Sequence, residues 1–132
     1  MEETAKTLRF MQFYAHEAHN LCSGETFFSD HDFLGGLYPV YEDAYDSIIE
    51  RMIGLDMEVD ICGINIDASE LVESAKFKNV KTSFQTLLKT EKLLCKTIEE
   101  YLDKYSEGTK QLLGEICNQS EIRQYKLTQR TT

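Results

Sequence analysis

The sequence predicts an all-α fold, because apolar residues recur at spacings of three and four over long stretches and the chain contains a single proline, Pro39. The length of 132 residues suits one compact domain with a single core. We therefore predict one helical domain that spans residues 1–132.

The first half of the chain predicts two long helices. One runs from Glu3 to about Leu21, where apolar residues form a single stripe. The other opens at Ser29 and Asp32, which resemble a capping pair, and continues to about Gly54. Because Pro39 lacks an N–H group and crowds the preceding turn, a kink is expected near residues 35–39.

The second half predicts a short helix followed by two long ones. Asp67 can cap the short helix, which extends through Phe77 with Leu71 and Val72 facing inward. The third long helix covers about 79–105, and the fourth follows Gly108 and reaches about residue 127, with a frayed end at 130–132. Four amphipathic helices with a short helix in the crossover between the second and third predict a ferritin-like four-helix bundle.

Charge and composition argue against several functions. Lys and Arg total 14 against 23 Asp and Glu, so the net charge of -9 opposes direct binding to nucleic acid. Neither a membrane span nor a signal peptide is recognisable, which predicts a cytoplasmic protein. The four cysteines form no CxxC pair, and we expect buried free thiols.

All three histidines, His16, His19 and His31, lie within sixteen positions. The first two share one helical face, and His31 begins the next helix, so the rings can converge if the two helices pack antiparallel. Imidazole is a ligand for transition metals. The alternative is that each histidine serves packing or capping.

Carboxylates follow on the second predicted helix. Glu42, Asp46 and Glu50 form an acidic stripe at four-residue spacing, whose mutual repulsion solvent, Arg51 or a bound cation would relieve. Together with imidazole, carboxylates favour iron, manganese or zinc. The alternative is an ordinary solvated face.

The order and spacing of these residues resemble the Dps family of mini-ferritins. His19 is followed by Gly24, Phe27 and His31 in the segment HEAHNLCSGETFFSDH, and the segment DSIIER supplies Asp46 and Glu50. The segment SEGTKQLLGEICNQSEIRQYKL is similar to the last helix of that family. The resemblance spans roughly residues 10–127.

The resemblance implies a ferroxidase centre between two subunits, with His19 and His31 from one chain and Asp46 and Glu50 from its mate. Such a centre oxidises Fe(II) with hydrogen peroxide or dioxygen, stores the ferric product and limits oxidative damage. A homodimer and a closed dodecameric shell are implied, and zinc or manganese also suits the donors. His16 matches a histidine that is frequent in the family one turn before the ligand, where it would orient the ligand or serve packing. Glu42 and Arg51 are further candidates beside the ligands.

The chain departs from the family pattern at two positions. Gly35 stands where the family usually has a carboxylate four residues after the second histidine, and Asn20 stands where tryptophan is common. The Lys-rich tail that binds DNA in many relatives is also missing, so DNA binding is not expected. A second hypothesis is therefore a ferritin-like structural or interaction module that has lost catalysis and binds another protein.

Overall fold

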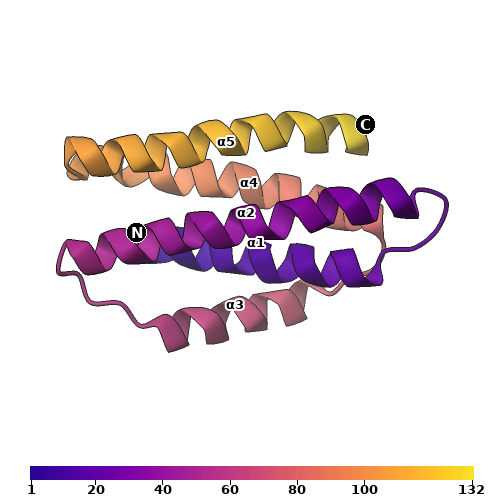
Figure 1. Cartoon of the computed structure of the whole chain (residues 1–132), viewed down its shortest axis with the longest axis horizontal. Coiled ribbons are helices and arrows are strands. Elements are labelled where there is room, and N and C mark those ends of the chain that lie inside the picture. The colour runs from indigo at the N-terminus through magenta and orange to yellow at the C-terminus, as the bar shows by residue number, and fades with distance from the viewer.

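A computed structural model describes all 132 residues as helices and connecting segments, with no strand. Its elements are α1 (Glu2–Leu21), α2 (Phe27–Gly54), α3 (Ile61–Ala75), α4 (Val80–Tyr101), the short 3₁₀ helix η1 (Leu102–Lys104) and α5 (Glu107–Thr131) (Figure 1). The predicted all-α class is confirmed. None of these helices combines the length and the apolar character needed to cross a bilayer.

The long helices form two antiparallel hairpins, α1 with α2 and α4 with α5 (Figure 1). Contacts between α1 and α4 join the hairpins, and α3 packs on α1. In Figure 1, α3 runs from the end of α2 back toward the start of α4, so that α2 and α4 point the same way. The expected short helix in the crossover is therefore present.

Two helices start at other residues than the predicted ones. The first turn of α2 begins at Phe27, where the Thr26 hydroxyl donates to Asp30 Oδ2 at 2.6 Å and the Ser29 hydroxyl donates back to the Thr26 carbonyl. The pair Ser29–Asp32 therefore does not cap this helix. The N-cap of α3 is Asp60, which accepts from the Gly63 N–H at 2.9 Å.

Other local predictions also change. Asp67 lies within α3 and pairs with Lys6 at 3.1 Å instead of capping a helix. The third long helix ends at Tyr101, and α5 continues to Thr131 because Arg130 donates to both carboxylate oxygens of Asp30, at 3.1 and 3.0 Å. The predicted frayed end is thus wrong. Pro39 lies on the exposed side of α2, which continues beyond it, and the kink stays a prediction.

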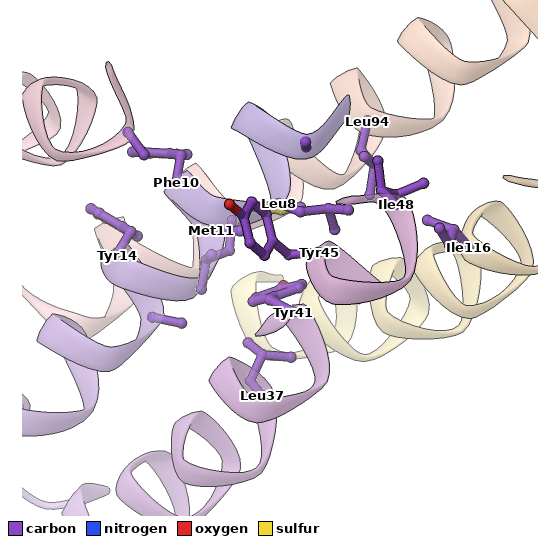
Figure 2. Close-up of a cluster of buried hydrophobic side chains, with 14 of the residues drawn as sticks. Leu8, Phe10, Met11, Tyr14, Leu37, Tyr41, Tyr45, Ile48, Leu94 and Ile116 are labelled. Carbon is purple, nitrogen blue, oxygen red and sulfur yellow. The ribbon is translucent and has the colours of Figure 1, made fainter. Parts of the chain in front are cut away.

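The core lies where the four long helices meet. Figure 2 shows its side chains converging from α1, α2, α4 and α5; labelled among them are Leu8, Met11, Tyr14, Leu37, Tyr41, Tyr45, Ile48, Leu94 and Ile116. A few apolar residues expected inside are exposed instead: Leu21, Leu71, Tyr101, Ile122 and Tyr125. Of the four cysteines expected to be buried, Cys22 and Cys95 are buried, Cys117 is half-buried and Cys62 is exposed.

A buried ion pair links α4 to α5 within this core. The Arg123 guanidinium donates from Nε to Glu91 Oε1 at 2.8 Å and from Nη2 to Oε2 at 3.2 Å. Glu91 is fully buried, and the guanidinium lies 5.1 Å from the centroid of the Tyr41 ring. Burial opposes the charge on Arg123, yet the hydrogen bonds and charge of Glu91 raise its pKa overall. Arg123 therefore remains charged inside the bundle.

Candidate metal centre

The α1–α2 hairpin brings His19 and His31 together. His19 lies in the last turn of α1 and His31 near the start of α2, and their rings stack at 3.7 Å between centroids with 20° between planes. Phe27 covers His31 at 4.9 Å. The predicted convergence of these two histidines is confirmed.

Each of the two rings is tied to the backbone of the other residue. His19 Nδ1 lies 2.8 Å from the His31 carbonyl oxygen, and His31 Nδ1 lies 2.8 Å from the His19 carbonyl oxygen. Since a carbonyl oxygen only accepts, both Nδ1 atoms carry a proton. In the neutral rings, the lone pairs are therefore on the two Nε2 atoms. Metal-binding histidines commonly have this arrangement, with the other ring nitrogen donating to a backbone carbonyl.

Gly35 makes room for the His19 ring. A Cβ atom added at Gly35 would lie 3.0 Å from His19 Cε1 and 3.3 Å from Nδ1, whereas one added at the neighbouring Gly36 would meet nothing within 4 Å. The missing side chain at position 35 therefore lets an imidazole pack directly against α2. The edge of the His19 ring also contacts Tyr38 at 5.5 Å between centroids.

His16 does not join the stacked pair. Its ring is 6.3 Å from that of His19 and stacks on Tyr38 at 4.0 Å with 11° between planes. Its side chain is exposed at the surface of α1. His16 therefore packs on Tyr38, and Tyr38 in turn contacts the His19 ring. An orienting or packing role of His16 is compatible with this arrangement.

The acidic stripe lies farther along α2. Glu42, Asp46 and Glu50 are exposed, and Glu42 accepts a 2.8 Å hydrogen bond from Gln12 Nε2. Arg51, considered as a partner for the stripe, donates instead to Thr109 Oγ1 on α5 at 3.1 Å. No cationic side chain forms an ion pair with any of the three carboxylates.

One chain does not bring the histidines and the predicted carboxylate ligands to one point. Asp46 is 15 residues beyond His31 on the same helix, which corresponds to about 22 Å along its axis. No group of three or more His, Cys, Asp or Glu residues in the chain could hold a metal ion. Within one chain, the fold therefore brings His19 and His31 together and leaves Asp46 and Glu50 at a distance from them.

Two polar residues of α1 that the sequence did not single out, Arg9 and Gln12, form hydrogen bonds that reach Glu42 of the acidic stripe. Arg9 donates to Gln12 Oε1 at 2.8 Å and lies 3.6 Å from the centroid of the Tyr45 ring, and Gln12 in turn binds Glu42. Arg9 and Gln12 lie at the spacing of the buried face of α1. The sequence pattern there does not indicate that these polar side chains hydrogen-bond to each other and to Glu42. Arg9 also donates to Asn65 of α3 at 2.8 Å.

Comparison with known proteins adds no further assignment. No protein-family model, curated protein or solved structure matches the chain. A relationship to the Dps family therefore rests on the spacing of residues in the sequence.

Proposed function

We propose that this protein is a Dps-like mini-ferritin that oxidises and stores iron at centres formed between two chains of a ferritin-like homodimer. The observation that carries the proposal is the His19–His31 pair, whose Nδ1 atoms are bound to backbone carbonyls and whose Nε2 atoms are left for a metal. The single crossover through α3 supports a ferritin-like topology (Figure 1).

The order of residues along α2 supports the second chain as the source of the carboxylates. Two α2 helices from different chains can pack antiparallel about a twofold axis midway between residues 40 and 41. Each residue then faces the residue of the second chain that lies equally far from this midpoint in the opposite direction along the sequence. His31 then faces Glu50 of the second copy, and Gly35, which carries the His19 ring, faces Asp46. The exposed apolar residues Phe28 and Ile53 also face each other.

This register gives each dimer two identical centres of imidazole and carboxylate donors, a combination that suits ferrous iron. At a centre, two Fe(II) ions lose one electron each, and hydrogen peroxide takes up both electrons and two protons as its O–O bond breaks to give two water molecules. The histidines hold the ions through Nε2, and the carboxylates stabilise the higher charge of the ferric product. The net charge of -9 favours the approach of cations.

A complementation experiment tests the shared centre. His31→Ala and the double variant Asp46→Asn/Glu50→Gln should each oxidise Fe(II) with peroxide at least about tenfold more slowly than the native chain. When the two inactive chains are mixed and refolded together, half of the dimers are mixed and each has one intact centre, so about a quarter of the native activity should return. Ferric product is followed by absorbance under anaerobic conditions.

Glu100→Gln, an exposed change on α4, is the control and should keep the native rate. A mixture that stays inactive would contradict a centre shared between chains. Native rates in both parent variants would overturn the assigned ligands altogether.

A catalytically silent ferritin-like scaffold that binds another protein is the second candidate, and the packing at Gly35 favours it. The carboxylate that completes the family pattern is missing, and the His19 ring crowds the place where its side chain would begin, with His19 Cε1 3.0 Å from an added Cβ. The histidine pair then serves to lock the α1–α2 hairpin through its two backbone hydrogen bonds.

Gly35→Asp separates the two candidates. In an iron-binding centre the added carboxylate should tighten Fe(II) binding by about tenfold, after the His19 ring shifts by a few tenths of an ångström. Gly36→Asp, where the new side chain meets open space, is the matched control and should leave binding unchanged. Fe(II) affinity is measured by anaerobic titration. A Gly35→Asp protein that binds no more tightly than the control would favour the scaffold.

A further inference from the structure

A pair of thiols lies between α4 and α5, away from the histidine pair. The Cys95 thiol donates to the Cys117 carbonyl oxygen at 3.8 Å, which places the Cys95 sulfur next to the backbone of Cys117. Gln124 Nε2 contacts the same sulfur at 3.5 Å and Ser120 Oγ at 3.1 Å. Cys95 is buried and Cys117 is half-buried, so the pair can be reached from the Cys117 side.

The other two cysteines have no thiol beside them. Cys22 is buried at the end of α1, where its sulfur lies 3.5 Å from the His19 carbonyl oxygen, and Cys62 is exposed on α3. Only Cys95 and Cys117 therefore combine proximity, facing helices and access from solvent.

The surroundings of Cys117 disfavour its thiolate form. Burial raises the pKa of Cys117 to about 12, with further contributions from Cys95 and from the carboxylates Glu99 of α4 and Glu121 of α5. A thiol with so high a pKa is a slow nucleophile at neutral pH. Because Cys117 must ionise before it reacts, we expect oxidation to be slow at neutral pH.

We propose that Cys95 and Cys117 are the site of an intramolecular disulfide that covalently joins α4 to α5. With glutathione disulfide as oxidant, the Cys117 thiolate attacks one sulfur of the reagent and releases one glutathione. The Cys95 thiolate then attacks the Cys117 sulfur of the mixed disulfide and releases the second. Two S–H bonds of the chain and the S–S bond of the reagent are broken, one S–S bond forms between Cys95 and Cys117, and the two electrons and two protons leave with the two glutathione molecules.

The test uses the full chain with Cys62→Ser, which removes the exposed thiol, in metal-free buffer that contains glutathione disulfide. Mass spectrometry should show the loss of two hydrogens and, after digestion without reductant, one linked peptide pair that contains Cys95 and Cys117. The rate should rise about tenfold per pH unit between pH 7 and 9, because the thiolate fraction does. Oxidation should also raise the urea midpoint, and Cys117→Ser in the same background should abolish that rise.

Three results would overturn the proposal: a mixed disulfide at Cys117 that persists, a bridge that includes Cys22, or no loss of thiols at pH 9. The peptide map of the Cys62→Ser chain decides among them without any change at the paired cysteines. Because no iron is present, the outcome is independent of the proposed ferroxidase activity.

Discussion

Replacing Arg123 with methionine should lower the free energy of unfolding by about 3–5 kcal/mol, because the change leaves the Glu91 carboxylate buried without its cation. Both oxygens of Glu91 accept from Arg123, and no water reaches this side chain. The hydrogen bond from Ser120 goes to the Glu91 main-chain carbonyl and does not replace the lost partner. Urea denaturation followed by circular dichroism measures the change.

The double variant Glu91→Met/Arg123→Met provides the comparison. Replacing both charges with apolar side chains of similar size removes the cost of burying them, so the double variant should be about as stable as the native protein or more so. If Arg123→Met costs less than about 1 kcal/mol, the ion pair is not buried as the structure has it.

Phe84→Ala should destabilise the protein by about 3–5 kcal/mol, because it opens a cavity at a junction of three helices. Phe84 of α4 is buried and meets the Phe33 ring of α2 edge to face at 5.8 Å. The guanidinium carbon of Arg130 on α5 lies 5.2 Å from the centroid of the Phe84 ring. Differential scanning calorimetry and urea denaturation can both detect a loss of this size.

Leu93→Ala serves as the control on the same helix. Leu93 is 53% exposed, so its truncation should change stability by no more than about 0.5 kcal/mol. Equal losses in the two variants would mean that Phe84 does not anchor the packing of α2, α4 and α5.

Helix class and order could be predicted because apolar residues recur at helical spacing, most clearly in α1 and α4 and less clearly in α5. The exact starts could not, since α2 begins without a side-chain cap and α3 is capped by a residue upstream of the predicted one. Thr26 and Asp60, not Ser29 and Asp67, occupy these positions. Asp67 was predicted to be an N-cap because its ion-pair partner, Lys6, is distant in sequence and local spacing does not indicate the pair.

At the candidate metal centre, the sequence predicted that His19 and His31 meet, because a short turn between antiparallel helices places them side by side. Their exchange of backbone hydrogen bonds and the fit of the His19 ring onto Gly35 depend on side-chain packing, which spacing does not describe. The pair Glu91–Arg123 was also missed, since 32 residues separate its members and charged residues are usually solvent-exposed.

Contacts within each hairpin join residues that are closer in sequence than the contacts between the two hairpins. Within a hairpin, neighbours are joined by short turns, which favours rapid assembly. Contacts between hairpins, such as Tyr14–Ser83, Phe33–Phe84 and Asp30–Arg130, close much longer loops that include all of α3. The order of folding should therefore be α1–α2 and α4–α5 first and their docking last. The same interface is where the native protein should open first in transient fluctuations, with each hairpin still helical.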